Sequence, residues 1–276
     1  MKGRRMQGPS RRPALSARGA APSDLLASVA MLAGLVALWW AASHGEWVSR
    51  VFLPTPELTW GSLRHGLGLG AAGEGAGDLA GYSLATLGRM VAGWVLAAVL
   101  GIGLGAAIGA SASLRAWLGP TLEFIRPLPA SAVIPLAISV FGLSSGMVLA
   151  VVAFGAMWPV LLATVQGLAS VHPRLREVGA ALQLSRLGFI VKIGLPAALP
   201  DILAGMRLAL TVSLIVSVVG EMIASQPGLG QAILLAARAF RASDLFAGIA
   251  LLGAIGFASN AALALAERRL LGWQRP

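Results

Sequence analysis

The chain has 276 residues, of which 57% are hydrophobic and only 12% are charged, and its mean hydropathy is +0.80. This composition is typical of an integral membrane protein, and the length leaves no room for a fused ATPase domain beside several membrane spans. Cysteine is absent, which excludes disulfides, thiolate metal sites and cysteine nucleophiles.

Long apolar stretches predict an all-α fold with six membrane-spanning helices. The span predicted third in the chain contains Pro135 and two further prolines, which suits a helix lining a cavity, where neighbouring groups satisfy the freed carbonyls. The fifth carries Arg207 and Glu221, which are 14 residues apart. That separation is about 21 Å along a helix, so each side chain is expected to snorkel to an opposite interface. The predicted spans are residues 25–43, 90–110, 127–143, 147–169, 202–224 and 245–266.

The basic residues predict the orientation of these spans. Six of the 21 lie in the amino-terminal tail, residues 1–24. With the amino terminus inside, fifteen basic residues fall on inner segments and five on outer ones, in agreement with the positive-inside rule. Orientation thus accounts for the tail without a nucleic-acid partner, which is the alternative that a net charge of +10 suggests. The run 25–43 is longer than a signal-peptide core of about 7–15 residues, so an uncleaved first helix is expected rather than a signal peptide.

No catalytic set is apparent in the sequence. A P-loop requires a lysine directly after glycine, and neither Lys2 nor Lys192 follows one. The histidines, His44, His65 and His172, are far apart and lack the spacing of a metal site. We therefore expect no ATP site, no metal and no enzymatic activity in this chain.

The longest inner connection, residues 170–201, carries the most distinctive pattern. It contains Glu177-Val178-Gly179-Ala180-Ala181-Leu182-Gln183-Leu184, and Leu195-Pro196 follows 18 and 19 residues after the glutamate. This spacing predicts a short amphipathic helix, a turn and a second helix that ends before the proline.

In this connection the chain resembles the permease subunits of binding-protein-dependent ABC importers, whose cytoplasmic EAA loop pairs an acidic start with a downstream Leu-Pro. The resemblance extends over about residues 52–271. Within the family, the chain is similar to the branch that imports sulfonates, taurine, nitrate and related small solutes. The segments that carry it outside the loop are 52–56, 126–129, 134–136, 202–207, 220–225 and 228–230.

The resemblance implies a type I importer-like permease domain over residues 25–276, in a bacterial inner membrane, with the amino terminus cytoplasmic. It implies a pathway formed with a second copy, as a homodimer, and a solute delivered by an extracytoplasmic binding protein. ATP and Mg would be bound by separate ATP-binding cassette subunits, onto which the loop docks as a coupling helix. The loop residues that the resemblance assigns to this docking are Glu177, Gly179, Ala180, Ala181, Gln183, Gly188, Leu195 and Pro196.

The loop departs from the family pattern in one place. The family usually has two alanines after the glutamate and a glycine six residues on, whereas this chain has Val178, Gly179 and Gln183. The missing glycine would ordinarily form the sharp turn between the loop helices, and Gly188 is the expected substitute.

Two further patterns lie within the spans. Gly101, Gly105 and Gly109 recur every four residues and predict close helix packing, within one subunit or between two. Ser213, Ser217, Glu221 and Ser225 form one polar helix stripe, which either lines a solute path or bonds to neighbouring helices. With Pro135, the stripe is the candidate pathway or gate.

An ion-coupled secondary transporter is the alternative function, but it predicts broken helices at matching places in two halves, and Pro135 has no counterpart. An intramembrane enzyme would need nucleophiles, bases or metal ligands at membrane depth, and none is evident. The sequence therefore favours a permease subunit without catalysis of its own.

Overall fold

A computed structural model describes residues 22–45, 49–69, 78–125 and 127–272. Every regular element in these residues is a helix, which confirms the all-α prediction. The chain divides into two units, residues 1–49 and 50–276, which are described one at a time. Most of the predicted basic tail, residues 1–21, lies outside the described residues.

The first unit contains helix α1, Pro22–His44, which is long and apolar enough to cross a membrane. Most of its large apolar side chains from Leu26 to Trp40 are exposed, around most of the helix. A helix of this kind needs lipid or another apolar surface to cover it.

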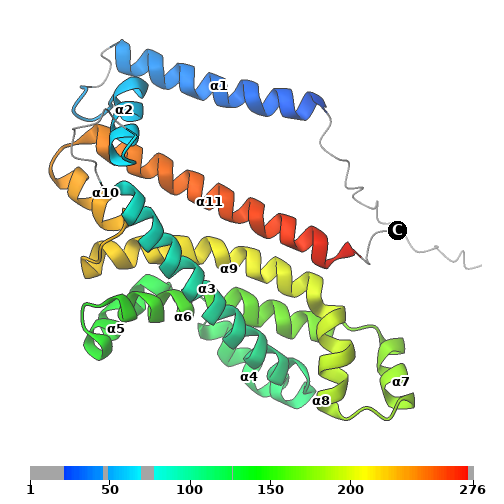
Figure 1. Cartoon of the computed structure of the whole chain (residues 1–276). Helices are drawn as coiled ribbons and strands as arrows, with labels where there is room; N and C mark the ends of the chain where they lie inside the picture. Colours follow the sequence, from blue (N-terminus) through cyan, green and yellow to red (C-terminus); the bar gives the residue numbers. More distant parts are fainter. Residues whose placement is uncertain (1–21, 46–48, 70–77, 126, 273–276) are drawn as a thin grey trace, which may run out of the picture. The chain divides into compact units, whose positions relative to one another are not determined.

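The second unit is built around three long helices, α3 (Leu79–Gly109), α6 (Ser145–Ala169) and α9 (Leu195–Ala224). α6 packs along both of the others, and Ala97, Val160 and Ala209 meet fully buried in the centre (Figure 1). α10 and α11 pack against α9, and α2 packs against α11. The remaining elements are α2 (Pro56–Gly66), α4 (Ala112–Ile125), a 3₁₀ turn (Ala130–Val133), α5 (Ile134–Phe141), α7 (Pro173–Ala181), α8 (Arg186–Phe189), a π-helical turn (Ile190–Gly194), α10 (Leu229–Arg238) and α11 (Ala242–Leu270).

Glycines on α3 allow this core to pack closely. A Cβ added to Gly101 would lie 2.8 Å from Val160 Cβ, and one added to Gly105 would lie 2.8 Å from the carbonyl oxygen of Leu161. Gly109 faces Leu168 in the same way, at 3.1 Å. All three contacts are made with α6 of the same chain, so the small residues bring two backbones together within one subunit.

Five helices in the described part are long and apolar enough to cross a membrane, and a bent pair of helices raises the number to six. That pair is α4 with residues 130–141, and it bends by 86°. The prediction of a span at 127–143 therefore does not match a single crossing helix, because α5 has eight residues and rises only about 12 Å. Pro127 and Pro129 lack an N–H and restrict the residue before them, which ends regular α-helix there.

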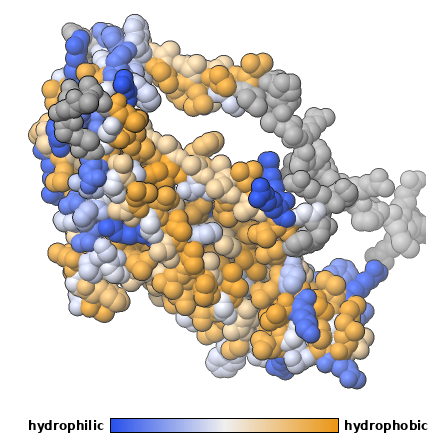
Figure 2. All heavy atoms as spheres, in the orientation of Figure 1, coloured by the Kyte–Doolittle hydropathy of each residue, from blue (hydrophilic) through white to orange (hydrophobic). Residues whose placement is uncertain are grey.

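The surface of the second unit agrees with a membrane location. Apolar atoms cover the long helices, and hydrophilic atoms gather near α2 and α10 at one end and near α7 and α8 at the other (Figure 2). Such a band of exposed apolar side chains requires lipid around it.

Two of the three charged residues of α9, Arg207 and Glu221, form ion pairs with other helices. Arg207 forms an ion pair with Glu267 of α11. Glu221 is fully buried, and Arg89 of α3 is its ion-pair partner. The prediction that Glu221 snorkels was wrong, because a partner 132 residues earlier in the chain neutralises it inside the protein.

Candidate functional site

The connection between α6 and α9, residues 170–201, is the first candidate site and is called the 170–201 loop below. Its first helix, α7, begins after His172, whose ring Nδ1 accepts the N–H of Arg174 at 3.2 Å. Glu177 and Ala181 are exposed on α7, while Gly179 is buried. The loop therefore has an inner face toward the rest of the chain and an outer face toward its surroundings.

The turn after α7 is made by Gln183 in a left-handed conformation, with φ = 51°. The N–H of Leu184 donates to the carbonyl of Gly179 at 3.1 Å, and the N–H of Gln183 donates to that of Ala180 at 3.0 Å. These two bonds form a Schellman motif, in which glycine is the usual residue at the position that Gln183 occupies. The expectation that Gly188 supplies the turn was wrong. Gly188 lies inside α8, where its N–H donates to the Ser185 hydroxyl that caps that helix.

Gly179 provides the close contact that folds the loop on itself. A Cβ at this position would lie 2.6 Å from Cδ2 of Phe189. A larger residue would push α7 away from α8, so glycine in place of the family's alanine suits a loop with phenylalanine at 189.

The second helix of the loop does not end before Pro196. α8, the π-helical turn and α9 form one helical run from Arg186 to Ala224. Pro196 lies in the first turn of α9, directly after the π-helical turn, where its missing N–H is tolerated. Leu195 and Pro196 thus connect the loop to the core helix rather than separating the two.

The second candidate site is the Glu221 cluster, made of Thr86, Arg89, Glu221 and Gly230. Oε2 of Glu221 accepts the Thr86 hydroxyl at 2.9 Å and the Gly230 N–H at 3.0 Å. Oε1 accepts Arg89 Nη1 at 2.8 Å. These charge-assisted bonds satisfy the buried carboxylate of α9 with donors from α3 and α10.

The bonds of Arg89 and Thr86 extend this cluster to the turn before α10. Arg89 also donates to the carbonyl of Pro227 at 2.8 Å, and the Thr86 hydroxyl accepts the N–H of Leu229 at 2.9 Å. Gly228 is required beside the carboxylate, since a Cβ there would lie 2.3 Å from Oε2 of Glu221. One carboxylate therefore links α3 to the end of α9 and the start of α10.

The polar stripe predicted on the fifth span is only partly enclosed, because Ser225 is exposed at the C-cap of α9. Ser213 and Ser217 are fully buried, and the Ser213 hydroxyl donates to the carbonyl of Ala209 at 2.8 Å. The Ser217 hydroxyl has no hydrogen-bond partner in the described part of the chain, which costs stability in this conformation. Pro135 is exposed on α5, whereas Ser213 and Ser217 are buried. The described residues contain no group of acidic or histidine side chains able to hold a metal.

Comparison with known proteins decides the family. Residues 97–272 match the model of binding-protein-dependent transport system inner membrane components. The chain belongs to this family. It is the permease component of an ABC importer, and the all-helical, multi-pass membrane fold agrees with that assignment.

Individual relatives of the permease match over most of its length. The putative aliphatic sulfonates transport permease protein SsuC of Bacillus subtilis is 33% identical over 243 residues, which cover 87% of this chain and 84% of that protein. The taurine transport system permease protein TauC of Escherichia coli is 31% identical, with 89% of each chain covered. The nitrate import permease protein NrtB of Leptolyngbya laminosa is 30% identical over 68% of this permease and 67% of that protein.

Sequence reasoning missed Thr86, Arg89 and Gly230 as partners of Glu221. Arg89 counted only as an outer basic residue in the orientation argument. The available signal was the rule that an ionisable group inside a span requires a partner. The Glu221 cluster shows that the partner can come from a distant helix.

Proposed function

We propose that this permease forms the pathway for a small oxyanion-bearing solute and that the 170–201 loop receives the force for transport. A separate ATP-binding cassette subunit would bind ATP and Mg, hydrolyse the ATP and dock on the loop. An extracytoplasmic binding protein would deliver the solute, and two copies of the permease would form the pathway as a homodimer. The amino terminus and the loop would lie on the cytoplasmic side of a bacterial inner membrane.

The outer face of the 170–201 loop carries this proposal. Leu182 and Leu187 are 64% and 71% exposed on either side of the Gln183 turn. Exposed leucines on a capped hydrophilic loop are typical of a surface that a partner covers. Glu177 is exposed on α7 and would add a charged contact at the rim of this surface.

The helical run from Arg186 to Ala224 supports transmission from this loop to the core. It begins at the turn after α7 and ends beside Glu221, so a movement of α7 acts on α9 through continuous backbone. The Glu221 cluster is a suitable gate because it joins α3, α9 and the start of α10 through one carboxylate, and opening would require these bonds to exchange for a second arrangement. Neutralisation by Arg89 also removes the repulsion that a bare carboxylate would exert on an anion.

The solute class rests on the relatives. Their names describe permeases for aliphatic sulfonates, taurine, nitrate and bicarbonate. These compounds share a small oxyanion group, and we assign this permease to a solute of that kind. Family membership does not support the ion-coupled secondary transporter.

The coupling proposal is tested by copurification of the ATPase with tagged permease. Glu177→Ala and the double substitution Leu182→Ser/Leu187→Ser should each reduce the recovered ATPase at least about five-fold, because they remove an edge charge or the apolar contact. Leu58→Ser is the matched control, since Leu58 is 53% exposed on α2, outside the loop. Equal recovery of ATPase by all variants would exclude docking on this loop.

The solute proposal is tested separately with the reconstituted complex. Uptake of labelled sulfonate, taurine, nitrate or bicarbonate into vesicles should require ATP and the binding protein. Uphill uptake by the permease alone, driven by an ion gradient, would contradict the proposed mechanism.

A further inference from the structure

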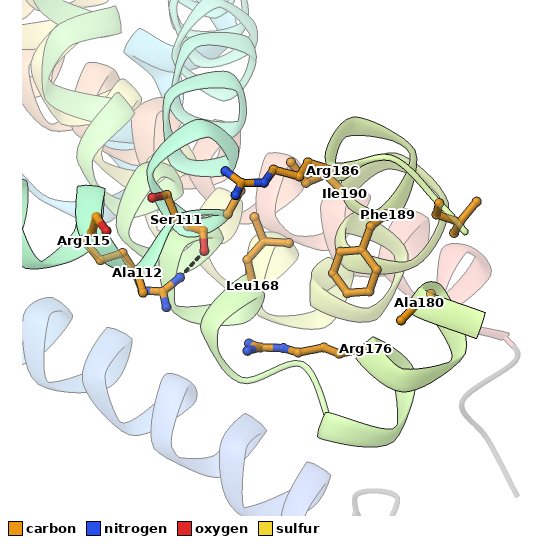
Figure 3. A pocket seen from close by; sticks show the side chains of 14 residues that line it. Ser111, Ala112, Arg115, Leu168, Arg176, Ala180, Arg186, Phe189 and Ile190 are labelled. Atoms are coloured by element: carbon orange, nitrogen blue, oxygen red, sulfur yellow. Dashed lines mark hydrogen bonds between the residues drawn. The ribbon is translucent and has the colours of Figure 1, made fainter. Parts of the chain in front are cut away.

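A cavity of about 560 Å³ lies between the start of α4 and the inner face of the 170–201 loop. We call it the basic pocket. Its walls come from residues 109–115 at the α3–α4 junction, from Leu168 of α6 and from α7, α8 and the turn between them. Figure 3 shows Arg176 and Arg186 reaching from the loop toward the junction, where Ser111 and Arg115 lie.

The basic pocket carries a concentrated positive charge. Arg115, Arg176 and Arg186 line it, and no acidic side chain does. None of the three arginines makes an ion pair with another described residue. Arg115 donates to the carbonyl of Gly109, and Arg176 donates to that of Ala169 at 3.3 Å. Each guanidinium has five N–H donors, so these single bonds leave most of the donors available to an anion.

The first turn of α4 adds to this charge. The Ser111 hydroxyl accepts the N–H of Leu114 at 3.3 Å and thereby caps the helix. Ala112 and Ser113, which also line the pocket, lie at the positive end of the α4 dipole. The pocket therefore combines three cations with the amino-terminal end of a fourteen-residue helix.

Apolar groups beside the basic pocket indicate where the anion comes from. Leu168, Phe189 and Ile190 form part of its wall. α4 continues from the pocket with Trp117 and Phe124 83% and 79% exposed. A free phosphate compound gains nothing from this surface, whereas the acyl chains of a lipid would cover it.

We propose that the basic pocket binds the phosphate headgroup of an anionic phospholipid, with the acyl chains lying along α4. Basic pockets between membrane helices are the usual sites for such headgroups. The bound phosphate joins the α3–α4 junction to the 170–201 loop through Arg115 on one side and Arg176 and Arg186 on the other. Binding rests only on the chain and its lipid, whereas any effect on ATP hydrolysis also requires the proposed docking of an ATPase.

The test measures lipid binding to the full-length permease in detergent micelles by native mass spectrometry. Phosphatidylglycerol should bind in preference to phosphatidylcholine of the same acyl composition. Arg176→Gln/Arg186→Gln should weaken phosphatidylglycerol binding by about five-fold for each arginine removed. Arg174→Gln/Arg269→Gln is the matched control; it removes the same charge from two exposed arginines outside the pocket and should bind as the unmodified chain does.

Three results would overturn the proposal: no preference for phosphatidylglycerol, equal weakening by the control, or full displacement of the lipid by millimolar inorganic phosphate. The last result would assign the pocket to a soluble phosphate compound. Normal lipid binding by a chain that recovers no ATPase would refute the proposed coupling and leave the lipid site intact.

Discussion

The Glu221 cluster and the 170–201 loop stabilise the two ends of α9 in opposite ways. The cluster surrounds one buried carboxylate with two side chains of α3 and a backbone N–H of α10. The loop uses backbone bonds and a close glycine contact, and leaves most of its side chains exposed. Buried charge-assisted bonds make substitutions in the Glu221 cluster costly. The 170–201 loop is held by its backbone, so its exposed side chains can be substituted with less effect on the fold.

The largest effect is expected at the Glu221 cluster. Glu221→Ala should lower the free energy of unfolding by about 3–5 kcal/mol, because it leaves Arg89, Thr86 and the Gly230 N–H without their shared acceptor. Denaturant titration of the purified permease in micelles measures this loss. Glu123→Ala, which removes an exposed carboxylate on α4, should change stability by less than about 0.5 kcal/mol. Similar losses for both variants would show that the buried bonds of Glu221 do not stabilise the permease more than an exposed carboxylate does.

A smaller effect is expected in the core between the two ends. Gly105→Ala should destabilise the permease by about 1–3 kcal/mol, since the added methyl would contact the Leu161 carbonyl and Thr164 of α6. Gly103→Ala should stabilise it by about 0.5–1 kcal/mol, because no atom lies within 4 Å of the added methyl and alanine favours helix. Thermal unfolding of the two variants side by side gives the sign, and the same sign for both would contradict the packing of α3 on α6.

The smallest effect is expected at the loop turn. Gln183→Gly should stabilise the permease by about 0.5–1 kcal/mol, because glycine adopts φ = 51° without the steric cost that a side chain brings. Gln183→Val should destabilise it, since a β-branched side chain is strained in the left-handed region. Protection of the Leu184 amide in hydrogen exchange reports the turn directly, and it should rise in the first variant and fall in the second.

Local sequence patterns predicted the long helices well and the short ones poorly. The spacing of Gly101, Gly105 and Gly109 indicated a packing face, and α6 occupies it. Apolar length located α3, α6, α9 and α11 because a helix that crosses lipid must be apolar over its length. The span at 127–143 stays a prediction, because proline is compatible both with a kinked span and with the end of a helix, and α4 and residues 130–141 meet at an 86° bend.

The candidate sites likewise differ in whether a local sequence pattern could predict them. The amphipathic pattern of α7 was visible in consecutive residues, whereas the partners of Glu221 lie 135 and 132 residues earlier, at Thr86 and Arg89. No local pattern connects residues so far apart. The Gln183 turn could not be predicted from propensity either, because backbone bonds from Leu184 and Gln183 hold a residue type that rarely adopts this conformation.

The 39-residue helical run from Arg186 to Ala224 has a geometric consequence for access from solution. At 1.5 Å per residue its contour is about 58 Å, roughly twice the hydrocarbon thickness of a bilayer. Even with bending (Figure 1), α8 must stand clear of the lipid whenever Glu221 remains near the opposite surface. Water-soluble crosslinkers should therefore reach Leu187 in membranes that contain the permease without its ATPase subunit, on the side where the loop lies.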